Sequence, residues 1–335
     1  MRDDVDDPQL LAHLIPNVRH SELELQTPTG WSRFNPSLWR DGGGYRAIVR
    51  SSNYELFEPG YAIYDDDSIT RTRNYSVWLR DDFSVVRVEV IKDETVTPPA
   101  LPGRSLGFED CRLFRWNGEW FATASMRDRN SSAVAQVGVM RLVGNTFRDL
   151  RLLSDSRTKR DEKNWMPIST SAGIHLVYGC GPTVVLRFDP LSGECEEVAR
   201  RNAPAVADSL HGGSQGVEID GSYLLVVHEA IQTDGGLWWY PHRFVRLDAR
   251  FNMTGISRRF YFQRPGVEFC AGLVRRGSEL IASYGVQDRS AWLASLPLRS
   301  AINLLEPVEN GVIKWRNGRV DLFDPALPTP TVAMG

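Results

Sequence analysis

The sequence predicts an all-β chain folded as a five-bladed β-propeller. Short runs rich in Val, Ile, Tyr, Phe and Trp, broken by Gly, Asp and Asn, fill most of its 335 residues. A helical apolar period is confined to the first fifteen residues and to residues 298–306. One hairpin layout recurs five times, and radial repetition is a way for all-β chains to protect their sheet edges. A β-sandwich is the alternative, but it requires no such repeat.

The five repeated segments each contain a strand, a glycine-containing turn and a second strand. They span residues 35–50, 110–125, 165–180, 213–228 and 269–284, and they align without gaps on Gly43, Gly118, Gly173, Gly221 and Gly277. Asn-Gly and Asp-Gly at two of these turns favour tight hairpins. A further strand follows each hairpin, at residues 75–86, 136–147, 183–194, 242–253 and 290–301, the last ending in the possible helix. Each repeated unit is therefore predicted to contain about four strands.

No Ser/Gly linker divides the chain, so the domain boundaries follow from the repeat. We expect an N-terminal extension at residues 1–29 and a catalytic propeller at residues 30–300. A C-terminal extension at residues 301–335 is expected to close or flank the propeller.

Composition excludes several classes of protein. The chain is 42% hydrophobic and 24% charged, with a formal net charge of −3, so it lacks the broad basic surface of a nucleic-acid-binding protein. Its apolar runs are far shorter than the roughly 20 residues of a membrane span. The acidic N-terminus does not resemble a signal peptide, and we expect a cytoplasmic protein. Four cysteines without CxxC spacing predict neither a zinc site nor any other metal site. The oligomeric state is left open.

The shared register predicts where a site lies. The first strand of a hairpin starts where the second ends, so ten positions from five units meet at one edge of the ring. Eight residues before the glycines stand Asn35, Asp110, Trp165, Gly213 and Phe269, and seven residues after them stand Arg50, Ser125, Cys180, His228 and Tyr284. Polar residues recur at this edge, which predicts a polar pocket on the axis.

Glu109 and Asp110 are the candidates for acid–base chemistry. A carboxyl group in a partly desolvated pocket has a raised pKa and can donate a proton near neutral pH. The alternative is that Asp110 caps a turn and Glu109 pairs with a surface arginine.

Arg50, Lys163 and His228 are three potential cations on the same face, which suits phosphate or pyrophosphate. Alternatively, Arg50 only pairs with Asp110, and His228 is a structural histidine at a strand end. Asp288 is a candidate for hydrogen bonds to substrate hydroxyls, or else a turn residue.

Aromatic residues offer a stacking surface for a sugar or a base: Trp165, Trp238, Trp239 and Tyr240. Ser214 lacks the GxSxG context of a nucleophile, so we assign it to substrate binding instead.

The motifs resemble those of glycoside hydrolase family 130, which consists mostly of inverting β-mannoside phosphorylases, and those of the related glycosyltransferase family 108. The matching positions, in the family's order over residues 30–297, are Asn35-Pro36, Arg50, Glu109-Asp110-Cys111-Arg112, Lys163-Asn164-Trp165, His228 and Tyr284-Gly285-Val286-Gln287-Asp288. Cys111 stands where the family has proline, and residues 211–219 read HGGSQGVEI in place of a glycine- and proline-rich stretch. The sequence therefore resembles a divergent branch.

The resemblance implies a five-bladed propeller that transfers a hexosyl group, β-mannosyl in most of the family, with inversion. Asp110 would be the catalytic acid, and phosphate would be bound by Arg50, Lys163 and His228. Substrate contacts would come from Asn35, Glu109, Arg112, Trp165, Ser214, Tyr284 and Asp288. No cofactor is expected, because phosphate, a sugar phosphate or a nucleotide sugar acts as co-substrate for a carbohydrate partner. Two alternatives remain: a non-catalytic propeller that binds a glycan or a protein, and a plain glycoside hydrolase, which needs a second carboxylate.

Overall fold

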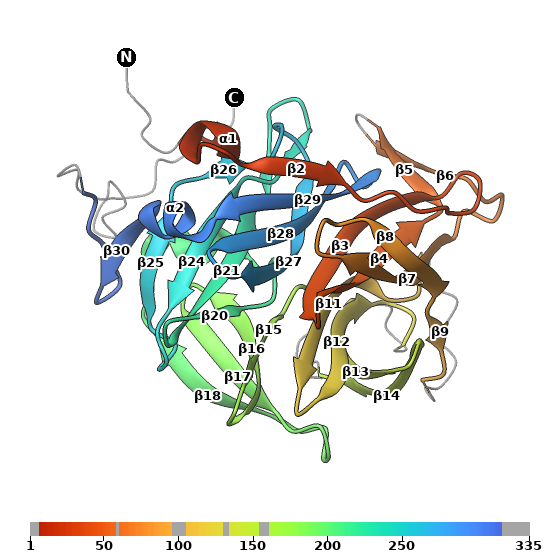
Figure 1. The fold of residues 1–335 in the computed structure, drawn as a ribbon, viewed down its shortest axis with the longest axis horizontal. Coiled ribbons are helices and arrows are strands. Elements are labelled where there is room, and N and C mark those ends of the chain that lie inside the picture. Colours follow the sequence, from red (N-terminus) through yellow and green to blue (C-terminus); the bar gives the residue numbers. More distant parts are fainter. Residues whose placement is uncertain (1–6, 58–59, 96–104, 130–133, 154–160, 317–335) are drawn as a thin grey trace, which may run out of the picture.

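The computed structural model describes residues 7–57, 60–95, 105–129, 134–153 and 161–316. Strands dominate these residues and form sheets arranged around a centre, as in a propeller (Figure 1). The all-β, propeller-like part of the prediction is confirmed. No helix in the described part of the chain is long and apolar enough to span a membrane.

Four of the repeated hairpins lie in regular sheets of four or five strands. The first sheet contains β3 (Ser32–Asp41), β4 (Gly44–Ser52), β7 (Thr70–Arg80), β8 (Val85–Val90) and β10 (Ser105–Leu106). The second contains β11 (Glu109–Trp116), β12 (Glu119–Met126), β13 (Gln136–Val143), β14 (Thr146–Leu152) and β9 (Lys92–Asp93). The third contains β15 (Met166–Thr170), β16 (Gly173–Cys180), β17 (Thr183–Phe188) and β18 (Cys195–Arg201). The fifth contains β27 (Glu268–Arg276), β28 (Glu279–Val286), β29 (Ser290–Pro297) and β2 (Arg19–Glu22).

The remaining hairpin lies in a nine-stranded sheet that departs from the repeat. Its strands are β1 (Gln9–Leu10), β19 (Leu210–His211), β20 (Val217–Ile219), β21 (Ser222–Glu229), β24 (His242–Leu247), β25 (Met253–Ser257), β26 (Phe260–Tyr261), β30 (Leu305–Glu309) and β31 (Val312–Ile313). The inner strand is split into β19 and β20, because Gly212 and Gly213 between them pack tightly against other backbone. A Cβ on these glycines would lie 1.8 Å from the Asn164 carbonyl oxygen and 2.2 Å from that of Val226. Four regular blades are therefore present, rather than the five equal blades that the sequence predicts.

Two small hairpins and three short helices complete the described residues. The hairpins pair β5 (Tyr54–Phe57) with β6 (Gly60–Ile63) and β22 (Ile231–Gln232) with β23 (Trp238–Trp239). The helices are α1 (Leu11–Leu14), α2 (Leu298–Asn303) and a 3₁₀ turn at Ala205–Ser209. Both predicted helical regions thus contain a helix, each shorter than its apolar pattern.

The turn residues explain the hairpins locally. Asn117-Gly118 and Asp220-Gly221 each place two successive residues at positive φ, at 46° and 79° and at 49° and 73°. This backbone matches the twist of paired strands and favours Asn-Gly and Asp-Gly. Each hairpin pairs antiparallel across its turn, and Gly43, Gly118 and Gly221 are each the second residue of a two-residue turn. Gly277 is the first turn residue of its hairpin and Gly173 follows its turn, so the register aligned on glycine is wrong by one residue in the third and fifth units.

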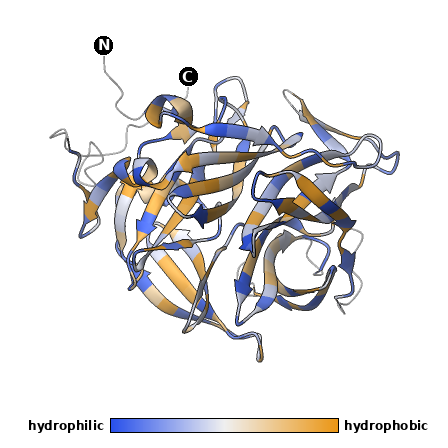
Figure 2. Cartoon of the chain, in the orientation of Figure 1, coloured by the Kyte–Doolittle hydropathy of each residue, from blue (hydrophilic) through white to orange (hydrophobic). Residues whose placement is uncertain are grey.

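The inner strands are joined near the axis by hydrogen bonds between sheets. The Ser37 hydroxyl accepts from the Leu113 amide at 2.9 Å, and the Gln215 side chain donates to the Leu38 carbonyl at 2.7 Å. Hydrophobic side chains gather on the strands, whereas turns and loops are mostly hydrophilic (Figure 2). The buried clusters lie between neighbouring sheets, one of them including Leu38, Ile281 and Leu293. This packing fixes the strand ends that carry the polar site.

Candidate functional site

A cavity of about 300 Å³ lies at the strand ends opposite the hairpin turns. We call it the inner cavity. Ten of the residues singled out from the sequence line it: Asn35, Arg50, Glu109, Asp110, Lys163, His228, Trp238, Tyr240, Phe269 and Asp288. The predicted convergence of strand ends from separate sheets is therefore present in the structure.

The inner strands bulge where they enter the cavity. The pairing of β3 with β4 shifts between Phe34 and Ser37, and that of β11 with β12 shifts between Glu109 and Arg112. Asn35 and Asp110 lie in these bulges with φ angles of 46° and 50°. Bulges redirect side chains, and strained backbone of this kind clusters at functional sites.

Asp110 is the carboxylate at the centre of the cavity. Its Oδ1 accepts hydrogen bonds from Arg50 at 2.9 Å and from the Asn35 amide at 2.8 Å. Burial raises the pKa of Asp110, but the charges of Arg50 and Arg112 and these hydrogen bonds outweigh it and lower the pKa to about 2. The expected raised pKa is therefore wrong: Asp110 is ionised and can act as a base.

Arg50 joins the carboxylates of the cavity. Besides Asp110, it lies 3.8 Å from Glu109, and its guanidinium stacks over Phe34 and Tyr54 at 4.9 and 5.9 Å from the ring centres. Burial opposes its charge, but the surrounding acidic groups outweigh burial and raise the pKa of Arg50 well above its ordinary value. Arg50 is thus a permanent cation fixed at the cavity wall.

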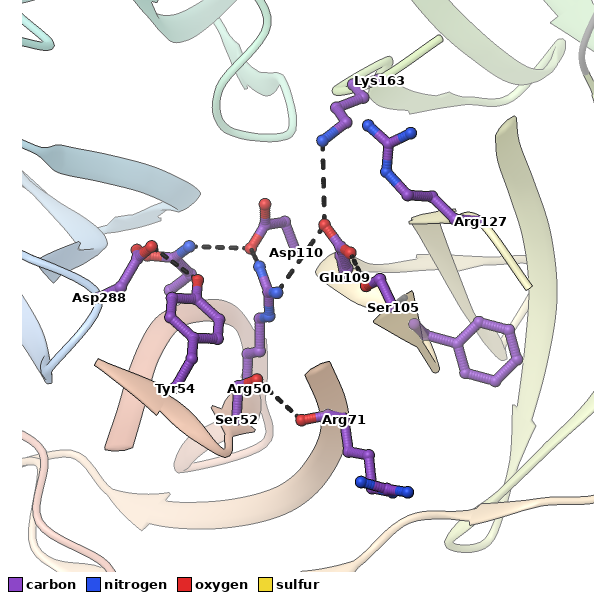
Figure 3. Close-up of polar contacts among 12 residues, drawn as sticks. Arg50, Ser52, Tyr54, Arg71, Ser105, Glu109, Asp110, Arg127, Lys163 and Asp288 are labelled. Atoms are coloured by element: carbon purple, nitrogen blue, oxygen red, sulfur yellow. Dashed lines mark hydrogen bonds and ion pairs between the residues drawn. The ribbon is translucent and has the colours of Figure 1, made fainter. Parts of the chain in front are cut away.

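Glu109 and Lys163 form the side of the cavity nearest the second and third sheets. The Ser105 hydroxyl donates to Glu109 at 2.7 Å, and the Lys163 ammonium lies 3.9 Å from the same carboxylate (Figure 3). Lys163 is 39% exposed. Its ammonium therefore remains accessible to a ligand.

Arg112 lies behind the cavity rather than in its lining. It is 1% exposed and donates to the Gly213 carbonyl at 2.9 Å, the Asp110 carbonyl at 2.6 Å and the Asn164 side chain at 3.0 Å. Burial lowers the pKa of Arg112 to about 10, which leaves it charged at neutral pH. Arg112 therefore links three sheets and holds Asp110, instead of contacting substrate as predicted.

Asp288 faces Arg50 from the fifth sheet. Its carboxylate accepts a hydrogen bond from the Tyr54 hydroxyl at 2.7 Å. Burial raises the pKa of Asp288 to about 6, against the effects of Arg50 and Tyr54. The cavity thus holds two carboxyl groups, Asp110 and Asp288, whose pKa values are far apart, a pattern typical of acid–base sites.

The raised pKa of Asp288 predicts a specific effect of pH on stability. Its pKa is about 6 in the folded chain against 3.8 ordinarily, so its contribution is present below pH 4 and is lost as the pH rises through 6. Between pH 4 and pH 7, wild type should lose roughly 2 kcal/mol of unfolding free energy relative to Asp288→Asn. Urea unfolding of both proteins at the two pH values measures this difference, and equal changes would contradict the raised pKa.

His228 does not supply the predicted positive charge. It is 4% exposed and lies between His211 and His242 on neighbouring strands. Burial, together with His242 and His211, holds the pKa of His228 well below its ordinary value. Its Nδ1 has no hydrogen-bond partner among the described residues, so a neutral imidazole is left to bind a ligand.

Three other predicted substrate-binding residues are not brought to the cavity. Trp165 is 3% exposed and donates to Glu162, while the Ser214 hydroxyl donates to the Gln215 carbonyl. The Tyr284 hydroxyl hydrogen-bonds to His20 on the far side of β28. Successive side chains of a strand point to opposite faces, and the glycine register is one residue off in the third and fifth hairpins, which carry Trp165 and Tyr284.

Tyr54 and Asn164 were missed as site residues. Tyr54 lies on β5, outside the repeated hairpins, and no spacing in the sequence connects it with Asp288. Asn164 lines the cavity at a φ of 63°, next to the predicted Lys163, and this adjacency was an available signal. Of the candidate stacking residues, Trp238 and Tyr240 do line the cavity. Within the part of the chain that the structure covers, no cluster of His, Cys, Asp or Glu has the geometry of a metal site.

Comparison with known proteins relates this fold to enzymes that act on mannosides. No family model and no curated protein matches the sequence. Among solved structures, the β-1,2-mannobiose phosphorylase from Listeria innocua is 11% identical with a TM-score of 0.57, covering 86% of this chain and 99% of the other. Two Leishmania mexicana structures are also similar. The mannose phosphorylase MPT-4 is 10% identical with a TM-score of 0.54, covering 88% and 92% of the two chains. The GDP-Man-dependent mannosyltransferase MPT-1 is 12% identical with a TM-score of 0.55, covering 83% and 90%.

A further similar structure comes from work on the GH130 family of mannoside phosphorylases and the glycoside hydrolases that it contains. It is 12% identical to this chain with a TM-score of 0.55. The resemblance drawn from the motifs is therefore confirmed for the fold: this chain folds like the mannoside phosphorylases of glycoside hydrolase family 130 and like the Leishmania mannosyltransferase and mannose phosphorylase.

Proposed function

We propose that this chain transfers a mannosyl group, with inversion, between a glycan hydroxyl and a phosphate-containing leaving group. The observation that carries the proposal is the ionised Asp110 held beside Arg50 in one cavity that Lys163 also lines. The fold shared with mannoside phosphorylases and a mannosyltransferase supports the choice of sugar.

In the synthetic direction, ionised Asp110 acts as the base. It takes the proton of the acceptor hydroxyl while that oxygen bonds to the anomeric carbon. The bond from this carbon to the phosphate oxygen breaks, and its electron pair leaves with the phosphate. Arg50 and Lys163 stabilise the charge that develops there.

In the phosphorolytic direction, Asp110 must carry a proton. A phosphate bound to Arg50 competes for the guanidinium and places negative charge near Asp110, and both effects raise the pKa of Asp110. Protonated Asp110 donates to the glycosidic oxygen as phosphate attacks from the opposite face. Asn35 orients the Asp110 carboxylate, and Asp288 binds a sugar hydroxyl. Such a reaction requires phosphate, a sugar phosphate or a nucleotide sugar as co-substrate and no further cofactor.

We also propose that the nine-stranded sheet serves as the fourth blade along the chain, which would bring the number of blades to five. Strands β20, β21, β24 and β25 follow one another as antiparallel neighbours, like the four strands of the other units. Its remaining strands are β19, β26, β1, β30 and β31.

A donor and acceptor screen tests the reaction. Mannose 1-phosphate and GDP-mannose are incubated with mannose and β-1,2-mannobiose, and released phosphate or GDP is measured. We expect release that depends on the acceptor. Equal release with and without acceptor, at any acceptor concentration, would contradict glycosyl transfer.

Lys163 provides a more local prediction. Lys163→Ala should raise the KM for the phosphate-containing donor about tenfold, because it removes one exposed charge–phosphate contact, while the melting temperature stays unchanged. Steady-state kinetics measures the effect, with the exposed Lys314→Ala as the matched control. An unchanged KM in Lys163→Ala would place the phosphate elsewhere.

Hydrolysis is the second candidate. Asp288, with its pKa near 6, lines the same cavity as ionised Asp110 and offers the second carboxyl group that an inverting hydrolase uses. Release of free mannose from mannobiose in phosphate-free buffer would favour hydrolysis. Release of mannose 1-phosphate only when phosphate is added would favour phosphorolysis.

A further inference from the structure

A second cavity, of about 530 Å³, borders the inner cavity and shares Leu56, Trp238 and Val267 with it. We call it the outer cavity. Its walls include residues of the β5–β6 and β22–β23 hairpins, neither of which belongs to the repeated units. These two hairpins therefore add a surface to the propeller that the repeat does not require.

Aromatic side chains are exposed at the outer cavity. Phe57, Trp238 and Trp239 line it with exposed fractions of 52%, 46% and 38%. Exposed aromatic groups gathered in a hollow are typical of binding sites, because ligand contact removes their apolar area from water. The C–H faces of sugar rings pack on such side chains.

The two cavities are joined by consecutive residues of one strained turn. Gln287 and Asp288 have φ angles of 54° and 48°; Gln287 lines the outer cavity and Asp288 the inner one. The backbone N–H of Gln287 donates to the Val267 carbonyl at 2.7 Å, which fixes the turn. A single extended ligand can therefore contact both residues.

The floor of the outer cavity is held in place by buried Glu268. Its carboxylate accepts hydrogen bonds from the backbone amides of Phe262, Gln263 and Arg264 at 2.6, 2.9 and 3.1 Å. The Tyr240 amide donates to the Gly266 carbonyl at 2.9 Å, which ties the β22–β23 arm to the same loop. The surface is thus organised before a ligand arrives, which reduces the entropic cost of binding.

A third cavity, of about 410 Å³, borders the inner cavity elsewhere and has a different lining. It shares Arg50, Tyr54, Leu56, Glu109 and Lys163 with the inner cavity and is also lined by Arg127, which pairs with Asp161. Figure 3 shows Asp288 on one side of Asp110, and Lys163 and Arg127 on the other. The three residues shared with the outer cavity carry no charge; the outer cavity is also lined by Arg264 and by Arg289, whose guanidinium pairs with Glu55. A phosphate group is favoured on the Lys163 side, where Arg50 also lies, and a glycan on the aromatic side.

We propose that the outer cavity binds the second and later sugar units of a neutral oligosaccharide. These units form the acceptor in synthesis and the untransferred part of the glycan in phosphorolysis. The assignment rests on the proposed function, because it takes the inner cavity as the place of the transferred sugar. It also puts glycan and phosphate on different sides of that sugar, as inversion requires.

Calorimetric titration with β-1,2-linked mannobiose, mannotriose and mannotetraose tests the assignment. The titrations use the Asp110→Asn background without phosphate, so that binding is measured without turnover. We expect affinity to rise with glycan length, and Trp239→Ala to remove this gain, about tenfold, while Trp239→Phe retains it. Exposed Leu191→Ala, distant from both cavities in sequence, is the surface control.

The outcomes separate this proposal from the proposed reaction. A length-dependent gain that Trp239→Ala removes supports the glycan site even if wild type transfers no mannose. A gain that persists in Trp239→Ala, or affinity that does not change with length, overturns it even if transfer is observed. GDP binding that Trp239→Ala abolishes also overturns it, in favour of a nucleotide.

Discussion

Replacing Asp110 by asparagine is expected to reduce turnover by about 10²–10⁴-fold, the usual contribution of a positioned proton-transfer group. The amide fills the same space and can still accept from Arg50 and Asn35 through its oxygen, but it cannot take or deliver the proton. Substrate affinity should change little. Initial rates with mannose 1-phosphate and β-1,2-mannobiose, or with the best pair from the screen, measure the effect.

Glu109→Gln is the matched control for this variant, because Glu109 is the adjacent carboxylate and also contacts Arg50. It should reduce turnover less, since its interactions with Ser105 and Lys163 give it a positioning role. If Asp110 is instead structural, Asp110→Asn will lower the melting temperature and the affinity without a selective loss of rate. Turnover close to that of wild type would rule out Asp110 as the proton-transfer group.

The second large effect is expected at Arg50. Arg50→Met leaves the carboxylates of Asp110 and Glu109 buried without their nearest cation, and breaking a buried ion pair in this way costs about 3–5 kcal/mol. Arg50 holds the pKa of Asp110 near 2. The unfolding free energy that Arg50→Met loses relative to wild type should therefore be largest above pH 4, and this difference should shrink as the pH falls toward 2. Denaturant unfolding across this range measures it.

The double variant Arg50→Met/Asp110→Asn separates this charge effect from lost packing over Phe34 and Tyr54. Removing the unpaired Asp110 carboxylate should restore roughly 1–3 kcal/mol of the lost unfolding free energy. Equal stability of the double variant and Arg50→Met would mean that packing, and not the ion pair, accounts for the effect.

The sequence predicts the fold well because hairpin turns are local. Asn117-Gly118 and Asp220-Gly221 specify tight turns without help from the rest of the chain, and a fixed spacing from each turn then places Asn35, Asp110 and Arg50 at one edge. The irregular fourth unit was not predicted. The split of its inner strand depends on close contact of Gly212 with Asn164, which lies almost fifty residues earlier in the chain.

The sequence predicted where the site lies, but not the protonation states of its residues. Residue types suggested a cation at His228 and a proton donor at Asp110. The buried environment and the neighbouring arginines reverse both, by keeping His228 neutral and Asp110 ionised. Such shifts depend on distances between sheets, which no local pattern encodes. The direction of Tyr284 was missed because Gly277 is the first residue of its turn, whereas Gly43 and Gly118 are the second residues of theirs, so the fifth unit is displaced by one position.

The position of β2 has a consequence for how the chain is made. This strand, near the N-terminus, forms the outer edge of the fifth sheet by pairing with β29, and Arg19 contacts Glu279 across 260 residues of sequence. A ribosome therefore releases β2 long before its partner exists. The ring cannot close until β29 has been synthesised, and contacts so distant in sequence form slowly. Until then, the unpaired edge of β2 is open to strands of other chains.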